Sequence, residues 1–359
     1  MPDMSSTVKT LSEETRQAYL DRCAGLMILF MVVFHVAGQY GRTDLYKSIG
    51  FESLFFFMFW FFFKGGIVDK HNEIDKVLRR GFVRLIVPAI IWTIIGMIIY
   101  EGVGIYLGRD ISGEYFSRQC HAFINEGSLD YHLPVWFLLS LYVVRLSYSI
   151  LYRISGDRRL HAFIAAISLE AAFILNQSEL SYPYYLANIP LGLALYIMGT
   201  ILGRRQYEKR VVIPFAIIYS LILLFIPSTI DFRTNRIIEG NYLAAILYSV
   251  SGCFLFNYLF QTIPARSAIL EHIGRNSLAW LLLHWPVKYI TGIIFGNLPP
   301  VDFMIKVVIV LLFTGCSVSA VKYISRTLNI GFIIGEHFPD LSPNHGSKYY
   351  KESDICILR

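Results

Sequence analysis

Charged residues are scarce in this chain. Of its 359 residues, 16% are charged and 55% are hydrophobic, whereas charged residues make up about 25% of an average soluble domain. This deficit excludes an ordinary soluble composition and favours a protein whose solvent is lipid. The net charge of +6 comes from short basic clusters between apolar segments. Such clusters orient helices in a bilayer, so we expect no nucleic-acid partner.

Cysteine and targeting signals are also sparse. Four of the five cysteines lie in or beside apolar runs or in an expected cytoplasmic tail, so no disulfide framework is expected. Residues 1–19 lack the basic, apolar and small-residue order of a cleavable signal peptide, and we expect the first apolar helix to be retained. Aromatic residues, in contrast, are abundant, with 27 Phe and 23 Tyr. They favour the interfaces and packed interiors of membrane bundles.

Long apolar runs dominate the sequence. A hydrocarbon layer about 30 Å thick needs ~20 apolar residues per helix. Segments near that length are 20–40, 47–63, 82–101, 132–153, 160–176, 184–203, 211–227, 241–261, 276–296 and 302–323. If the N-terminus is cytoplasmic, the inner connections hold more than twice as many Lys and Arg as the outer ones. We therefore predict an all-α polytopic transmembrane bundle of about ten helices, with both termini cytoplasmic and the plasma (inner) membrane as its location.

The chain divides simply around this bundle. We expect a cytoplasmic N-terminal segment at 1–19, one transmembrane domain at 20–323 and a cytoplasmic tail at 324–359. The tail contains Pro, Asn and Gly in a pattern typical of irregular structure. The longest outer connection, 102–131, predicts either a short interfacial helix or a lid. The sequence leaves both open.

Two histidines stand inside apolar segments, where an ionisable group costs roughly 2.5–3.5 kcal/mol and is a candidate for function. His35 shares a helical stripe with Asp21 and Ala24, at 100° per residue. His284 shares a face with Ser277. Imidazole can serve as a general base near neutral pH or accept an acyl group. Alternatively, each histidine only hydrogen-bonds a neighbouring helix.

Other polar and aromatic residues leave two interpretations open. Arg22 points to a different face from the His35 stripe. Glu52 and Glu170 fit interhelical hydrogen bonds or a water-filled cavity as well as catalysis. Trp136 fits an aromatic belt or a surface that stacks on a sugar. The basic stretch 64–84 fits simple orientation in the bilayer or a seat for the phosphates of coenzyme A, which Arg binds in bidentate fashion.

Five short motifs follow one another in an order known from a family of membrane enzymes. They are Asp21-Arg22-Cys23-Ala24-Gly25 leading to His35, Met58-Phe59-Trp60-Phe61-Phe62-Phe63-Lys64-Gly65-Gly66, Arg79-Arg80 with Arg84-Leu85-Ile86-Val87-Pro88, Trp136-Phe137-Leu138, and Ile273-Gly274-Arg275-Asn276-Ser277-Leu278 before His284. Together they resemble the acyltransferase-3 family, in particular its polysaccharide and fucose O-acetylase-like members. Ala24 departs from the family's Lys or Arg, and Phe59 and Gly65 replace its Pro and Ser.

The resemblance implies a membrane-bound O-acyltransferase that moves acetyl from acetyl-CoA to a hydroxyl of a cell-surface polysaccharide or its lipid-linked precursor. Its expected partners are membrane lipid, the acyl-CoA donor and a glycan acceptor, with no permanently bound cofactor and no metal site. The expected residues are His35 and His284 for catalysis, Lys64, Arg80 and Arg84 for the donor, and Asp21, Glu52, Trp136 and Ser277 for the substrate.

Two other functions remain open from the sequence. A transporter or flippase for a glycan or small polar solute would use the same histidines as proton relays. An inactive scaffold in an envelope glycan complex is favoured by Ala24 and disfavoured by the retained His35. The sequence specifies neither the acceptor sugar, nor the acyl group, nor the oligomeric state.

Overall fold

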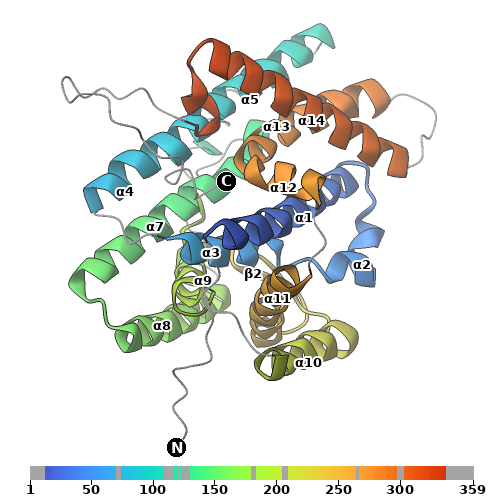
Figure 1. The fold of residues 1–359 in the computed structure, drawn as a ribbon. Helices are drawn as coiled ribbons and strands as arrows, with labels where there is room; N and C mark the ends of the chain where they lie inside the picture. The colour runs from blue at the N-terminus through green and yellow to red at the C-terminus, as the bar shows by residue number, and fades with distance from the viewer. Residues whose placement is uncertain are drawn as a thin grey trace, which may run out of the picture.

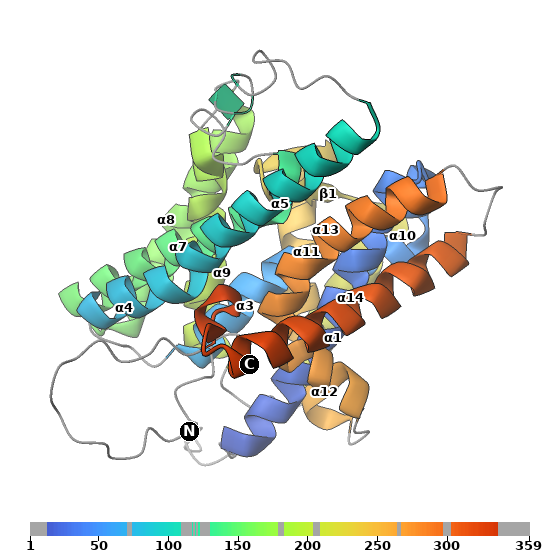
Figure 2. The same ribbon diagram turned by 90° about the horizontal axis from the view of Figure 1, so that it is seen from above.

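The described part of the chain is a bundle of helices (Figures 1 and 2). The computed structural model describes residues 13–69, 74–108, 117, 119, 121–122, 130–178, 183–203, 209–263, 267–296 and 303–336. Its elements are α1 (Glu13–Gln39), η1 (Thr43–Lys47), α2 (Ile49–Glu52), α3 (Phe57–Val68), α4 (Ile74–Gly81), η2 (Phe82–Ile86), α5 (Val87–Tyr106), η3 (Asp130–Val135), α7 (Trp136–Ile154), α8 (Arg158–Gln177), η4 (Pro183–Asn188), α9 (Ile189–Leu202), α10 (Lys209–Phe225), β1 (Thr229–Asp231), β2 (Arg236–Glu239), α11 (Tyr242–Thr262), α12 (Ala268–Arg275), α13 (Ser277–Gly296), α14 (Phe303–Thr327) and η5 (Gly331–Ile334).

The helices confirm the predicted fold class. Within the described residues, eight helical stretches of at least 18 residues are apolar enough to cross a membrane. The other two expected spans, 184–203 and 211–227, contain α9 and α10, of 14 and 17 residues. At 1.5 Å per residue these helices measure about 21 and 25 Å, less than a hydrocarbon layer of about 30 Å. The protein is a polytopic α-helical bundle; ten crossings and two cytoplasmic termini stay predictions.

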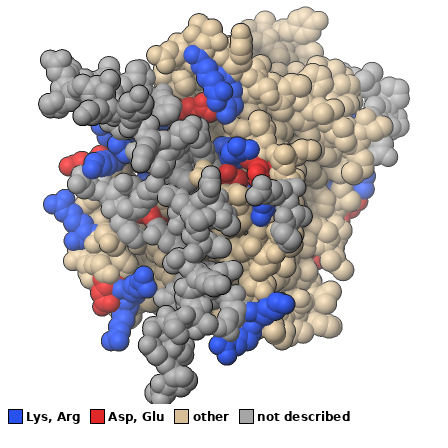
Figure 3. Space-filling model, in the orientation of Figure 1, with Lys and Arg blue, Asp and Glu red and all other residues tan. Residues whose placement is uncertain are grey.

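The outer surface of the bundle is apolar along several helices. Ile90, Ile94 and Ile98 of α5 are all exposed, and their four-residue spacing places them on one stripe. Figure 3 shows a broad area without charged side chains on the right of the view, while Lys and Arg stand in small separate groups elsewhere. Such a surface is matched to lipid rather than to water.

Helix α1 runs through the middle of the bundle and contacts α3, α11, α12, α13 and α14 (Figure 1). Its residues Cys23, Ala24 and Met27 are completely buried. Gly25 brings its backbone against α12, because a Cβ there would lie 2.2 Å from the carbonyl oxygen of Leu270. Small residues let helix backbones approach closely where lipid supplies no hydrophobic drive between helices. The centre of the fold is therefore set by backbone contact around α1.

The expected second span, 47–63, ends too early, because the apolar helical stretch runs from Ile49 to Val68. The chain forms η1 and α2, turns, and then enters α3, which continues through Lys64 to Val68. Lys64 is therefore buried within a helix rather than placed in a loop. Its ammonium nitrogen lies 5.8 Å from the centre of the Trp60 ring, and such a cation–π contact helps to hold a charge in the interior. Charge alone was thus a poor marker of the helix end.

The third span also begins earlier than expected. Helix α4 passes through η2, a five-residue π-helical segment, directly into α5. Arg80 is exposed on α4, and Arg84 is half-buried in the π-helical segment. Most of the outer connection 102–131 lies outside the described residues, so its form stays open.

The end of the bundle lies beyond the expected boundary at 323. Helix α14 continues to Thr327, and η5 packs against α5, where the Trp92 indole nitrogen donates to the Ile333 carbonyl oxygen at 2.8 Å. The ammonium group of Lys322 lies 2.9 Å from the carboxylate of Glu336. The residues up to Glu336 therefore belong to the packed structure rather than to an irregular tail.

Candidate active site

The two predicted histidines meet. His35 near the end of α1 stacks on His284 of α13, with ring centroids 5.3 Å apart and planes inclined by 26°. The edge of the Trp285 ring packs against His35 at 5.3 Å. His284 is completely buried and His35 is half-buried. Two residues about 250 positions apart in sequence thus form one imidazole pair.

A proline explains part of this geometry. Pro286 lies inside α13 and has no N–H, so the carbonyl of Leu282, four residues earlier, lacks its helical donor. The Nε2 atom of His132 lies 2.7 Å from that oxygen and donates to it. A carbonyl only accepts, so His132 carries its proton on Nε2 and leaves Nδ1 as an acceptor. His132 is completely buried.

The tautomer of His284 follows from the same argument. Its Nδ1 atom lies 3.1 Å from the carbonyl oxygen of Trp280, so Nδ1 carries the proton and Nε2 the lone pair. Within the described part of the chain, Nε2 is buried without a hydrogen-bond partner. A charged imidazolium would be poorly solvated at this completely buried position, so helix α13 presents a neutral imidazole with a free basic nitrogen at Nε2.

A large cavity lies beside His35. Its volume is about 630 Å³. Its walls are mostly aromatic and aliphatic, with a few charged groups: Met31, Phe34, His35, Tyr46, Lys47, Glu52, Phe55, Phe57, Met58, Leu133, Pro134, Trp136, Phe137, Ile222, Leu223, Pro227, Ser228, Thr229, Ile230, Asp231, Phe232, Arg233, Ile238, Glu239, Tyr248 and Leu281. Ligand sites are typically cavities of this size with few polar groups. The structure thus brings Glu52 and Trp136 to the same cavity as His35.

Tyr46 lines the cavity and lies outside the membrane-spanning helices. Tyr46 of η1 donates to the Phe34 carbonyl oxygen at 2.8 Å. Burial raises the pKa of Tyr46 above its ordinary value, because the charged phenolate is poorly solvated there. Tyr46 therefore stays a neutral donor and supports the end of α1 beside His35.

A β-hairpin forms one wall of the cavity. Strands β1 and β2 pair in antiparallel fashion, with Asp231 opposite Arg236. Asn235 in the turn adopts a left-handed backbone with φ of 55°. Its amide donates to the Ala172 carbonyl oxygen at 2.8 Å and accepts from the Tyr242 hydroxyl at 2.6 Å. The hairpin is thereby fixed to α8 and α11.

Replacing Asn235 by Ala is expected to lower the free energy of unfolding by about 2 kcal/mol, because two buried hydrogen bonds and a favourable left-handed residue are lost. Thermal unfolding of the purified protein measures this. Asn235→Gly keeps the backbone freedom and should lose less. Equal melting temperatures for Asn235→Ala and the wild type would show that the hairpin is held by other contacts.

Ser277 lines a small gap that adjoins the main cavity. A gap of about 10 Å³ is lined by Ile28, Met58 and Ser277 among others, and it shares Met58 and Leu281 with the cavity. Methionine side chains adapt their shape readily. The gap thus continues the cavity from the level of His35 along α13 toward the end where that helix begins.

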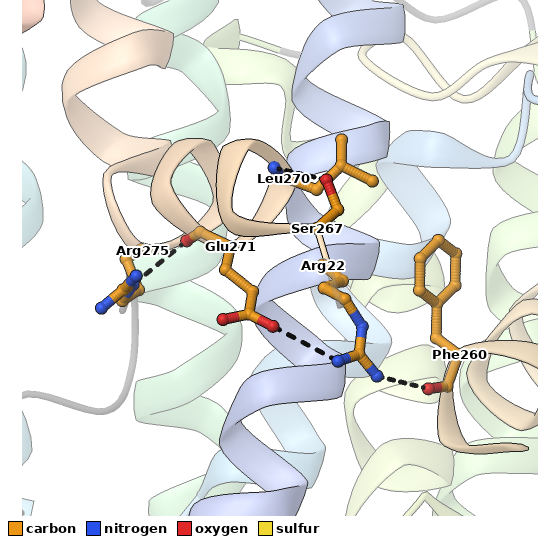
Figure 4. Close-up of polar contacts among 6 residues, drawn as sticks. All are labelled: Arg22, Phe260, Ser267, Leu270, Glu271 and Arg275. Atoms are coloured by element: carbon orange, nitrogen blue, oxygen red, sulfur yellow. Dashed lines mark hydrogen bonds and ion pairs between the residues drawn. The ribbon is translucent and has the colours of Figure 1, made fainter. Parts of the chain in front are cut away.

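The cationic residue beside the His35 stripe has a structural partner. Arg22 lies 3.3 Å from the carboxylate of Glu271 and donates to the Phe260 carbonyl oxygen at 3.0 Å (Figure 4). Arg22 therefore holds α1 against α12 and α11. This agrees with the prediction that its side chain points away from the His35 stripe. Asp21 is buried where Gly274 of α12 approaches, since a Cβ on Gly274 would lie 1.8 Å from the Asp21 carbonyl oxygen. Asp21 does not line the cavity.

The three predicted donor residues lie apart from the cavity. Lys64 is buried on α3 and acts electrostatically on Cys23 of α1, the residue beside Ala24. Arg80 and Arg84 lie on α4 and η2. None of them is among the described residues that line the cavity. Their role in donor binding stays a prediction.

Sequence reasoning missed His132 and Arg233. His132 is the first residue of the expected segment 132–153, and a histidine two residues before Pro134 at the start of an apolar run was a visible signal. Arg233 was counted only as an outer-loop cation, although the hairpin places it on the cavity wall. Only the folded chain brings either residue to the site.

The fold and the histidine pair define a polytopic membrane protein with an imidazole centre next to a large cavity. A family model described as an acyltransferase domain matches residues 17–320. The chain belongs to the acyltransferase-3 family. It is a multi-pass membrane acyltransferase. No curated protein and no solved structure gives a significant match to the chain.

Proposed function

We propose that this acyltransferase moves an acetyl group from acetyl-CoA to a hydroxyl of a cell-surface polysaccharide or of its lipid-linked precursor, in the plasma (inner) membrane. The observation that carries the proposal is His35, which lines a cavity of about 630 Å³ and is backed by His284. A general base must lie within reach of the proton it removes. A bound hydroxyl in this cavity meets that condition at His35.

The proposed transfer uses His35 as its base and His284 as the residue that positions it. An acceptor hydroxyl gives its proton to the ring of His35 as its oxygen attacks the thioester carbonyl. The C–S bond then breaks, and the proton passes to the departing thiolate of coenzyme A. His284 keeps the His35 ring in place, since its own ring is fixed to the Trp280 carbonyl oxygen. An ester and free coenzyme A are the products.

The apolar walls support an acceptor with an apolar or ring-shaped part. Trp136 stacks on Phe232 of the hairpin at 6.3 Å, and Glu52 lines the same cavity. Aromatic faces pack against the C–H faces of sugars, and carboxylates accept from their hydroxyls. We assign Trp136 and Glu52 to the acceptor.

The acyl-CoA donor would reach His35 from the end of the bundle opposite to the glycan acceptor. The gap at Ser277 continues the cavity toward the start of α13, which the charge distribution predicts to be cytoplasmic. A gap of about 10 Å³ admits no more than one water molecule, so the adaptable side chains of Met31 and Met58 would have to move aside for a thioester arm. The phosphates of coenzyme A would remain with cationic groups outside the gap. Lys64 on α3 stands near the position where Ala24 replaces the family cation.

Replacing Arg80 or Arg84 by Gln is expected to weaken acyl-CoA binding about ten-fold, because each of these side chains is at least partly exposed and each change removes one charge from the phosphates. Binding to the purified protein measures the affinity. Arg153→Gln, an exposed change at the end of α7, is the matched control. Variants that bind acyl-CoA as well as the wild type would assign these cations to orientation in the bilayer.

The direct test is acceptor-dependent release of free coenzyme A from acetyl-CoA by the purified protein. An acyltransferase releases one thiol for each ester formed, whereas a transporter releases none. Release that rises with the glycan acceptor supports the proposal. If acetylated glycan never forms while the folded protein moves glycan across vesicles, the proposal fails.

A further inference from the structure

A second, smaller cavity is lined by Trp285, the residue that packs against His35. Its volume is about 180 Å³, comparable with one hexose ring. It is lined by Gln39, Gly96, Ile99, Tyr100, Tyr131, Trp285, Pro286, Lys288 and Tyr289. These residues come from α1, α5, η3 and α13, and α5 and α13 lie side by side in Figures 1 and 2. We call this space the side cavity.

Lys288 supplies a cation to the side cavity. Its ammonium nitrogen lies 3.5 Å from the centre of the Trp285 ring. Among the residues that the structure describes, no carboxylate lies within ion-pair distance of it. Glu101 of α5 accepts from the hydroxyl of Tyr131, a residue of the cavity wall, at 2.5 Å. A half-buried ammonium without a counterion is costly, so the side cavity is electrostatically suited to an anion.

The other walls are aromatic and amide groups. Tyr100 and Tyr289 stack with ring centroids 4.7 Å apart. The Gln39 amide nitrogen donates to the Lys288 carbonyl oxygen at 3.0 Å, while the Gln39 amide oxygen is buried without a partner among the described residues. The side cavity therefore offers an acceptor for a hydroxyl, flat apolar rings and one positive charge.

We propose that the side cavity binds a carboxylate-bearing sugar residue of the acceptor, a hexuronate or a similar acidic sugar. Lys288 pairs with the carboxylate, the Gln39 amide oxygen accepts from a hydroxyl, and the tyrosine rings pack against the pyranose. A free carboxylate alone would use only Lys288. This assignment rests on the proposed function, because it names the acceptor of the same reaction.

Trp285 couples the side cavity to the catalytic pair. One part of its ring packs against His35 and the Lys288 ammonium lies over it. An acidic sugar held at Lys288 therefore fixes the wall on which the His35 ring rests. The acceptor would then occupy both cavities, with its acidic residue in the side cavity and the reacting hydroxyl beside His35.

The test is binding of sodium glucuronate to the purified full-length protein, followed by tryptophan fluorescence, which the contact of Lys288 with Trp285 makes sensitive to the site. We expect saturable binding that Lys288→Met weakens at least ten-fold and Lys288→Arg retains. Lys306→Met is the matched control, because Lys306 also stands over an aromatic ring, Tyr40, at 4.1 Å, yet does not line the side cavity. Glucose should not compete.

Three results overturn the inference. If Lys288→Met binds glucuronate as well as the wild type does, Lys288 is not part of the binding site. Acetate that competes as well as glucuronate shows a general anion site and removes the sugar from the assignment. The binding readout needs no acyl transfer, so it can succeed where the coenzyme A assay fails. Conversely, coenzyme A release with a neutral glycan and no glucuronate binding would reject only this inference.

Discussion

Replacement of His35 by Ala is expected to lower acyl transfer by about 10²–10⁴-fold, the usual contribution of a general base. The variant removes the only described imidazole on the wall of the main cavity, while the helix around it keeps its contacts. The measurement is O-acetylation of surface polysaccharide in cells, together with coenzyme A release by the purified protein. Because the vacated space opens into the cavity, added imidazole should restore part of the activity.

Two further variants sharpen this result. His284→Ala should also lower acyl transfer, because it removes the ring that holds His35 in place. Its site is completely buried, so added imidazole should restore less activity. His272→Ala is the control, because His272 is exposed on α12. Unchanged acetylation by His35→Ala at a normal protein level would contradict the proposed role of His35 as general base.

Replacement of Gly66 by Ala is expected to destabilise the bundle by about 3 kcal/mol, at the upper end of overpacking effects. A Cβ on Gly66 of α3 would lie 1.9 Å from the Tyr196 carbonyl oxygen of α9. On the facing helix, a Cβ on Gly199 would lie 2.0 Å from the Phe63 carbonyl oxygen. Both obstacles are backbone atoms, so the helices themselves must separate.

The measurement for this pair is thermal unfolding in detergent and the amount of folded protein in the membrane. Gly199→Ala should behave like Gly66→Ala. Gly102→Ala on α5 is the matched control, because nothing lies within 4 Å of a Cβ there. A helical Gly→Ala change without a clash stabilises by roughly 0.5–1 kcal/mol. If all three variants unfold at the same temperature, the α3–α9 contact accommodates an added methyl group without loss of stability.

Hydropathy predicted the fold class because lipid requires each spanning segment to satisfy its own backbone. It was less accurate for the helix ends. Lys64 carries a charge, yet α3 continues past it since Trp60 and the surrounding bundle hold the ammonium. The break between α2 and α3 and the π-helical segment at 82–86 are local backbone choices. Neighbouring helices decide these, and no periodicity within one segment reports them.

The site shows the same division. The sequence by itself determined that His35 and His284 lie in apolar helices, that Ser277 shares the face of His284, and that Arg22 points away from the His35 stripe. These follow from the cost of charge in lipid and from 100° per residue along one helix. Tertiary structure alone decided which side chains meet.

The stack of His35 on His284 joins helices from opposite ends of the chain. His132 enters because Pro286 leaves the Leu282 carbonyl free. Arg233 and Lys288 gain their surroundings from a hairpin and a second cavity. Each is a contact between elements far apart in sequence. The rotation of one helix against another depends on packing at glycines such as Gly25 and Gly66, and that depends on both partners at once.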